Sequence, residues 1–156
     1  MDRTGFEFED WSDGQFFSKD RGGEVQLLDS NGQQVMMQWE KRWMEQCVDV
    51  LAITPACDVL EIGFGCGYSA DRIQANAPRS HVIVECAEPV LVRLREWAAT
   101  RSNVQIIEGT WQRRLPELGV FHRIFFDDWG EPGLSDHEMA VSTHGFQPRP
   151  DFQGRF

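Results

Sequence analysis

An apolar run that ends in a glycine-rich turn constrains the fold of this chain more than any other feature. Asp58 to Ile62 is typical of a buried strand, and three glycines at alternate positions and then a helical pattern follow it. A second apolar run, His81 to Cys86, carries an acid, Glu85, near its end. Glycines let a ligand approach the backbone, and a carboxylate at a strand end accepts hydrogen bonds from ribose hydroxyls. The two runs therefore predict a nucleoside-binding half-site.

Helical and strand patterns alternate through residues 35–127. Apolar residues recur at three- and four-residue intervals from Val35 to Ile53, which predicts a helix that Thr54-Pro55 ends. The predicted elements are, in order, a helix over 35–53, a strand over 58–62, a helix over about 67–76, a strand over 81–86, a helix from 88, and strands over 103–108 and 120–126. Strands that alternate with helices predict an α/β fold with a parallel sheet.

Two less regular stretches flank this core. Residues 1–34 hold aromatic residues among acids, and Val25–Leu28 predicts a short strand that enters a tight turn. We expect this segment to act as a lid, or else to be a frayed terminus. Residues 128–156 show no clear period, so we expect an irregular tail. A doubly wound sheet needs about two more strands. We therefore expect a truncated sheet of four strands in which strand 120–126 is an exposed edge that invites pairing.

The charge balance narrows the class of partner. Twenty-five acidic residues against fifteen basic ones give a net charge of −10, which disfavours nucleic acid and anionic membranes and favours cationic substrates. The sequence holds no apolar run of about 20 residues, and residues 1–7 lack the apolar core of a secretory signal. Four cysteines show no metal spacing, so we expect a cytoplasmic protein with reduced thiols and no metal.

The spacing of the glycines distinguishes between nucleoside cofactors. A dinucleotide fingerprint has the spacing Gly-x-Gly-x-x-Gly, whereas this chain has Gly63-x-Gly65-x-Gly67, with Glu61 two residues before the first glycine. A pyrophosphate finds little to offset its charge beside Glu61 and Glu85. S-adenosylmethionine carries a sulfonium cation and no phosphate, so an acidic rim suits it. We favour S-adenosylmethionine over a dinucleotide and over a merely structural glycine turn.

Five short motifs resemble a known family. They are Val-Met-Met-Gln-Trp-Glu at 35–40, Glu-Ile-Gly-Phe-Gly at 61–65, Ile-Val-Glu at 83–85, Gly-Thr-Trp at 109–111 and Phe-Asp at 126–127. Over about residues 25–131 the chain resembles guanidinoacetate N-methyltransferase and its fungal relative that methylates the internal nitrogen of a protein arginine. The resemblance departs at Arg42-Trp43, where the family often has Pro-Tyr, and at Asp128, where it has Thr.

The resemblance implies a class I methyltransferase fold and a role for each matching residue. Glu40 and Asp127 would grip a guanidino group. Glu85 would hold the ribose of S-adenosylmethionine, and the other cofactor-binding residues would be Met36, Met44, Glu61, Gly63, Phe64, Gly65, Gly67, Thr110 and Trp111.

The two acids make chemical sense without the resemblance. A guanidinium is a poor nucleophile with a pKa above about 12, so it must be oriented and must lose a proton as it is methylated. Paired carboxylates can bind its planar fork and accept that proton. The predicted helix places Glu40 on one face with Met36 and Met44. The alternatives are a solvated Glu40 paired with Lys41 or Arg42, and Asp127 as a simple strand-end cap.

The sequence thus predicts an S-adenosylmethionine-dependent N-methyltransferase that acts on guanidinoacetate or an arginine side chain. The alternative is a non-catalytic remnant that binds a nucleoside, or that forms a homodimer through its open sheet edge.

Overall fold

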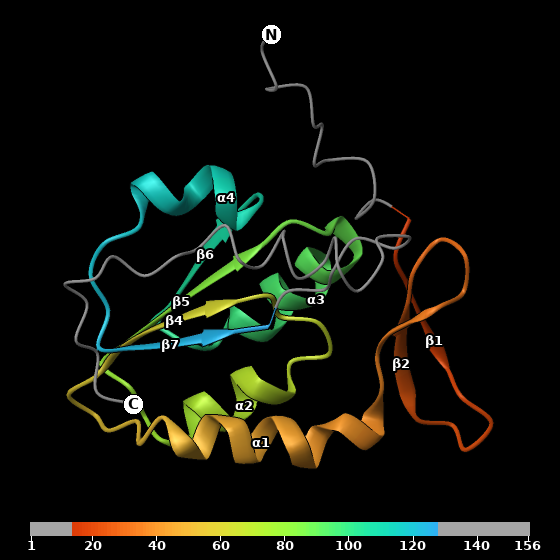
Figure 1. The fold of residues 1–156 in the computed structure, drawn as a ribbon, viewed down its shortest axis with the longest axis horizontal. Helices are drawn as coiled ribbons and strands as arrows, with labels where there is room; N and C mark the ends of the chain where they lie inside the picture. Colours follow the sequence, from red (N-terminus) through yellow and green to blue (C-terminus); the bar gives the residue numbers. More distant parts are fainter. Residues whose placement is uncertain (1–13, 128–156) are drawn as a thin grey trace, which may run out of the picture.

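The computed structural model describes residues 14–127, which form two sheets and the helices that pack around them (Figure 1). The larger sheet is parallel, with the strand order β6-β5-β4-β7. Its strands are β4 (Asp58–Ile62), β5 (Ser80–Glu85), β6 (Val104–Glu108) and β7 (Arg123–Phe126). The parallel α/β fold is therefore confirmed. β4 has the predicted bounds, whereas β7 begins three residues later than expected.

Helices connect the strands of this sheet. α2 (Tyr68–Ala75) links β4 to β5, α3 (Glu88–Ala98) links β5 to β6, and α1 (Lys41–Val50) precedes β4. Between β6 and β7 lie two short helical turns that the sequence did not predict, α4 (Trp111–Arg114) and η2 (Leu115–Glu117). Figure 1 shows α1 and α2 together beneath the sheet and α4 on its opposite side.

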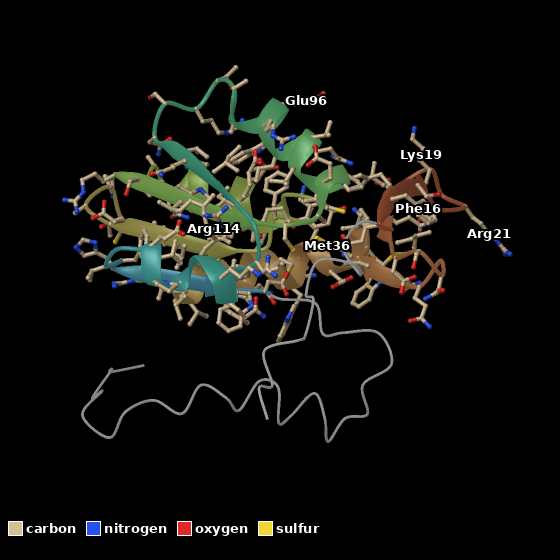
Figure 2. All side chains as sticks on the ribbon, turned by 90° about the horizontal axis from the view of Figure 1, so that it is seen from above. Phe16, Lys19, Arg21, Met36, Glu96 and Arg114 are labelled. Atoms are coloured by element: carbon tan, nitrogen blue, oxygen red, sulfur yellow. The ribbon has the colours of Figure 1, made fainter. Side chains whose placement is uncertain are left out.

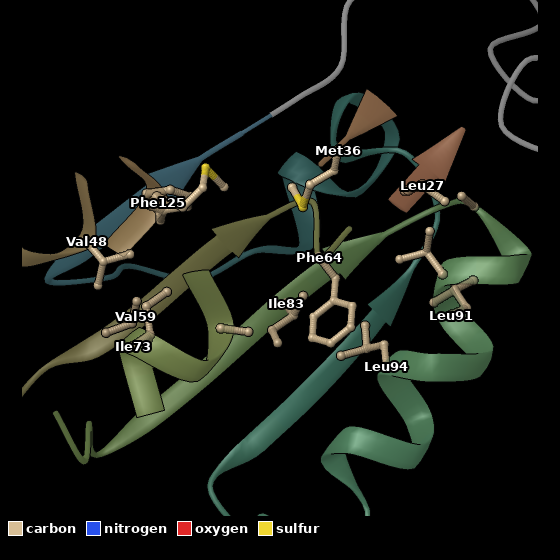
Figure 3. Packing of buried hydrophobic residues seen from close by; sticks show 14 of the residues in the cluster. Leu27, Met36, Val48, Val59, Phe64, Ile73, Ile83, Leu91, Leu94 and Phe125 are labelled. Atoms are coloured by element: carbon tan, nitrogen blue, oxygen red, sulfur yellow. The ribbon is translucent and has the colours of Figure 1, made fainter. Parts of the chain in front are cut away.

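The main core fills the space between the sheet and its three long helices. Alternate residues of the central strands, including Val59 and Ile83, point toward these helices, since successive side chains of a strand face opposite sides. Ile73 of α2 and Leu94 of α3 are fully buried against them, and Val48 of α1 is equally enclosed (Figure 3). These contacts fix the carboxyl ends of β4 and β5, from which the glycine turn and Glu85 project.

An antiparallel hairpin sheet lies beside the core. It consists of β1 (Phe16–Lys19), β2 (Val25–Leu28) and β3 (Gln34–Met36). The strand over 25–28 and the turn after it are confirmed, whereas β1 was not predicted. Leu27 is 1% exposed and belongs to the main core cluster. Figure 2 shows Lys19 and Arg21 projecting from one end of the molecule, with Met36 nearer the sheet.

The predicted helix over 35–53 is wrong at its start. Met36 ends β3, a 3-10 turn η1 (Gln38–Glu40) follows, and the α-helix begins only at Lys41. Trp39 and Trp43 produced the helical spacing, yet they are 70% and 65% exposed and share no buried face with Met36. The expectation that Met36, Glu40 and Met44 share one helix face is therefore also wrong.

Residues 1–13 and 128–156, which include part of the expected lid and the whole irregular tail, lie outside the described residues. Among residues 14–127, no helix is long and apolar enough to cross a membrane.

Candidate functional site

The glycine turn after β4, residues 63–67, forms a loop at the carboxyl edge of the sheet, where open α/β sheets bind ligands. We call it the glycine loop. Its outer amides bond to the backbone: Gly63 N–H donates to the Val84 carbonyl at 2.9 Å, and Gly67 N–H donates to the Phe64 carbonyl at 2.8 Å. The Phe64 ring is buried and packs edge-on against Trp97, so it supports the loop from within the core.

Glu85 joins the glycine loop to the turn after β5. Its Oε2 accepts the Phe64 N–H at 2.9 Å, and its Oε1 accepts those of Cys86 at 2.7 Å and Ala87 at 2.9 Å. Burial raises the pKa of Glu85, and the N–H groups of Ala87, Phe64, Cys86 and Gly65 oppose that rise. The residue expected to hold a ribose therefore lies at the carboxyl end of β5, and its oxygens accept hydrogen bonds from backbone donors.

Met36 lies directly on the glycine loop. Its Sδ accepts the Cys66 N–H at 3.1 Å. A Cβ on Gly65 would meet its Cε at 2.6 Å and its Sδ at 2.7 Å, so only glycine leaves room for the thioether. Met44 is buried in the same core cluster. The structure thus brings Met36 to the glycine loop from β3, and not from the predicted helix.

Glu61 lies beneath the glycine loop in an enclosed polar network. It is 0% exposed; its Oε1 accepts the Ser69 hydroxyl, and its Oε2 lies 2.8 Å from His81 Nε2. The other His81 nitrogen lies 3.1 Å from Gln74 Nε2. A ligand above the loop has no direct path to this carboxylate. The carboxylate of Glu61 is thus enclosed in the core, between Ser69 of α2 and His81 of β5.

The sequence did not single out three neighbours of the candidate site residues: Ser69 and His81, which contact Glu61, and Cys66, which contacts Met36. His81 carried a usable signal. His81 lies two residues before Ile83 on β5, and Glu61 lies two residues after Val59 on β4. Side chains two residues apart on a strand point to the same side, so both polar residues lie on the helix-covered face of the sheet.

Thr110 and Trp111 lie at the carboxyl end of β6, beside the end of β5. Gly109 N–H donates to the Glu85 carbonyl at 2.8 Å and ties the two strand ends together. Thr110 is 7% exposed, and its buried Oγ1 has no hydrogen-bond partner among residues 14–127. A buried hydroxyl without a partner is costly, so this atom fits a site that a ligand completes. The Trp111 ring packs edge-on against Phe126 at 5.2 Å.

Of the two predicted catalytic acids, Asp127 lies against the glycine loop through its backbone, and Glu40 lies beside Met36, which packs on the loop. Asp127 N–H donates to the Ile62 carbonyl at 3.1 Å, and its own carbonyl occupies the space that a Cβ on Gly63 would need. Glu40 Oε1 accepts the Met37 N–H at 2.8 Å, next to Met36. Burial raises the pKa of the Cys66 thiol, and the charge of Glu40 adds to that rise. Of the two partners in the alternative for Glu40, Lys41 lies 4.0 Å from Glu45 Oε1 and pairs with that residue.

Three features of these residues fit a nucleoside with an amino-acid end. They are the carboxylate at the end of β5, the partnerless hydroxyl at the end of β6, and a loop amide whose acceptor is only a thioether. Among residues 14–127, no group of three or more His, Cys, Asp or Glu side chains could hold a metal ion.

Comparisons with known proteins match the chain to one family. The family model described as guanidinoacetate N-methyltransferase matches residues 9–152. Protein arginine N-methyltransferase 2 of Kluyveromyces lactis is 38% identical over 108 residues, which are 66% of this chain and 26% of that protein. The Saccharomyces cerevisiae protein of the same name is 35% identical over 120 residues, which are 74% of this chain and 29% of that protein. The chain thus spans less than a third of the length of these relatives.

A solved structure shares the fold. Spermidine synthase from Thermotoga maritima superposes with a TM-score of 0.57 at 14% sequence identity, over 74% of this chain and 47% of that chain.

Proposed function

The chain belongs to the guanidinoacetate N-methyltransferase family and has the Rossmann-like fold of class I methyltransferases, and on this premise we propose that it transfers a methyl group from S-adenosylmethionine to a guanidino nitrogen. One observation carries the proposal: two acids that are far apart in the sequence lie at or next to residues that contact the glycine loop. The backbone of Asp127 lies against Gly63, and Glu40 bonds to the Met37 N–H beside Met36, whose sulfur accepts the Cys66 N–H. The similar fungal proteins are much longer than this chain. We therefore propose its activity, substrate and partners and do not conclude them from those proteins.

The residues around the loop support S-adenosylmethionine as the cofactor. When bound, it would supply an electrophilic methyl group on a sulfonium cation. Glu85 would accept hydrogen bonds from the ribose hydroxyls. The Thr110 hydroxyl, which has no hydrogen-bond partner among the described residues, would bond to the cofactor on its adenine side. Met36 and the Cys66 amide would contact the amino-acid end of the cofactor, and Met44 and the loop glycines would surround that end. Trp111 would lie beside Thr110. Glu61 would act from beneath, by holding the loop through Ser69.

The proposed acceptor is a guanidinium that Glu40 and Asp127 hold in line with the methyl group. Glu40 uses Oε1 to accept the Met37 N–H, and a carboxylate has capacity for further donors. Charge-assisted bonds to both acids would fix the planar fork, and one acid would take the proton that is lost on methylation. Orientation of this kind can supply up to about 7 to 11 kcal/mol of the barrier.

Two acceptors are in question, free guanidinoacetate and an arginine side chain of a protein. The names of the similar fungal proteins favour arginine, and the net charge of −10 suits either cationic group. We propose arginine as the first acceptor to test. The four cysteines lie in apolar segments without metal spacing, and on this basis we propose a reducing compartment such as the cytoplasm.

A methyl-transfer assay tests the proposal. The full chain is incubated with S-adenosylmethionine and either guanidinoacetate or an arginine-containing peptide, and products are read by mass spectrometry. The proposal predicts one added methyl group on a guanidino nitrogen of at least one acceptor. Binding of S-adenosylhomocysteine without transfer to either acceptor would contradict the acceptor assignment and retain the cofactor.

A second candidate, a binding protein that self-associates, is favoured by one observation. Among the described residues, β7 pairs with β4 on one side and has no strand on the other. Ile124 and Phe126 on this strand are 54% and 51% exposed, and such an edge pairs readily with another chain. Sedimentation beside the transfer assay separates the candidates: a homodimer that binds the nucleoside without turnover supports the second.

A further inference from the structure

Two of the middle amides of the glycine loop, those of Phe64 and Cys66, donate to side chains. Phe64 N–H donates to Glu85 Oε2 at 2.9 Å, and the Gly65 N–H is among the groups that lower the pKa of Glu85. Cys66 N–H donates to Met36 Sδ at 3.1 Å. A ligand that is to bond with these amides must therefore displace an acceptor that the protein itself supplies.

Of the two acceptors, Met36 is the easier to displace. A thioether sulfur accepts hydrogen bonds weakly, whereas the Glu85 carboxylate is a strong acceptor with several donors. The methionine side chain has three rotatable bonds and adapts to irregular space. It can therefore leave the loop without a shift of β3. While it stays, its sulfur and methyl group occupy the space above Gly65.

We propose that the Met36 thioether is a place-holder on the Cys66 amide, and that the carboxylate at the amino-acid end of S-adenosylmethionine or S-adenosylhomocysteine displaces it. This inference rests on the proposed function and adds a step to cofactor binding. A carboxylate takes the amide because charge-assisted hydrogen bonds are stronger than neutral ones. A nucleoside without the amino-acid end leaves Met36 where it is.

Two substitutions of Met36 with opposite expected effects on affinity test whether the ligand carboxylate displaces the thioether. Leucine at position 36 keeps an apolar side chain of similar size but cannot accept the Cys66 N–H, whereas the carbonyl of glutamine accepts it better than sulfur does. Calorimetry with S-adenosylhomocysteine and with 5′-methylthioadenosine, which lacks the amino-acid end, gives the affinity ratio. Met36→Leu should tighten S-adenosylhomocysteine about three- to ten-fold relative to methylthioadenosine, the range of one net hydrogen bond, and Met36→Gln should weaken it by a similar factor.

A measurement on the native chain follows Met36 itself and does not depend on the affinities of the variants. The methionines carry a ¹³C label on the methyl group, and the spectrum of Met36→Leu identifies the Met36 signal. S-adenosylhomocysteine should move this signal and that of the Cys66 amide, and methylthioadenosine should leave the Met36 signal in place.

Three outcomes would overturn the inference. The first is a change of S-adenosylhomocysteine affinity in the same direction in both variants. The second is an equal change for both ligands, and the third is a Met36 methyl signal that S-adenosylhomocysteine does not move. If the native chain binds neither ligand, the proposed function itself fails. Normal binding with an unmoved Met36 signal overturns the place-holder alone.

Discussion

Two buried glutamates on neighbouring strands show how much a residue depends on its surroundings. Glu61 is enclosed by Ser69 and His81, so both of its carboxylate oxygens have partners inside the protein. Glu85 faces the backbone donors of two loops at the carboxyl edge of the sheet. The sequence predicted both as one acidic rim, because the partner of Glu61 lies on another strand and only the folded chain brings it close.

At Glu40 the structural and the catalytic role can be separated. Glutamine at this position keeps an oxygen that can accept the Met37 N–H, which now bonds to Glu40 Oε1, but it cannot take a proton from the acceptor. Glu40→Gln should lower methyl transfer by about 10²-fold or more, since general bases contribute that much. Affinity for S-adenosylhomocysteine should stay within about two-fold.

The matched control is Glu45→Gln, which lies on α1, pairs with Lys41, and should leave transfer unchanged. An equal loss of activity and cofactor affinity in Glu40→Gln would show that Glu40 acts only as a structural cap.

Asp58 predicts a dependence of stability on pH. Hydrogen bonds from Arg79 and Ser80 hold the pKa of this carboxyl well below its usual value. A lowered pKa stabilises the fold above the usual carboxyl value of about 3.9, and this stabilisation is lost as the pH falls further toward the lowered value. Asp58→Asn should therefore reduce stability at neutral pH, and the difference from the native chain should shrink below about pH 4.

Urea unfolding at several pH values measures this difference. Arg79→Gln should show the same dependence of stability on pH, because it removes the donor of the Arg79–Asp58 hydrogen bond and not the acceptor. A deficit of Asp58→Asn that stays constant down to about pH 2 would contradict the role of the charge.

At the scale of elements, the sequence predicts strands and helices that have a regular pattern of apolar residues. It does not predict the residues at which one element ends and the next begins. β4 and α2 follow directly from the apolar run and the glycines after it. The start of α1 was misread because Trp39 and Trp43 have helical spacing but face outward. β1 was missed because Phe16 and Phe17 lie among polar residues, and pairing with β2 is what orders them.

The same limit applies to the candidate site. Motif spacing predicted which strand ends meet, and Glu85 and Asp127 lie at them. The contact of Met36 Sδ with the Cys66 amide depends on how the hairpin sheet docks, and no local pattern encodes it.

The start of α2 depends on Gly67. This residue caps the helix at φ +83°, and a Cβ there would meet the Phe64 ring at 2.8 Å. Gly23 has φ +84° but nothing within 4 Å of its Cβ position. Gly23→Ala should cost about 1–2 kcal/mol for the left-handed backbone alone, and Gly67→Ala should cost more by about 1–3 kcal/mol, the usual price of overpacking.

Denaturant unfolding of the two variants gives the difference directly. Equal destabilisation would show that Phe64 yields without cost, and that the glycine loop is less tightly packed than the contact distance implies.

At the scale of the whole molecule, the hairpin sheet and the parallel sheet share one core. Leu27 of β2 packs in the main core cluster, and the Arg93 guanidinium of α3 lies 4.2 Å from the centre of the Phe17 ring. The segment expected to be a lid or a frayed end is therefore anchored over residues 14–34. The position of Met36 on the glycine loop depends on this anchoring.

Leu27→Ala tests the shared core. It should lower the free energy of unfolding by about 2–5 kcal/mol, with a single transition by both fluorescence and circular dichroism. The control Leu115→Ala, whose side chain is 47% exposed, should change stability by less than about 1 kcal/mol. A separate early transition in Leu27→Ala would show that the hairpin sheet unfolds on its own.

The most direct test of the whole account is a crystal structure of the chain with S-adenosylhomocysteine. We predict that the ligand lies over the glycine loop, with its ribose hydroxyls bonded to Glu85 and its adenine beside Thr110. A structure in which Phe64, Cys66 and their neighbours keep their present partners, and in which the ligand binds elsewhere or not at all, would contradict the account.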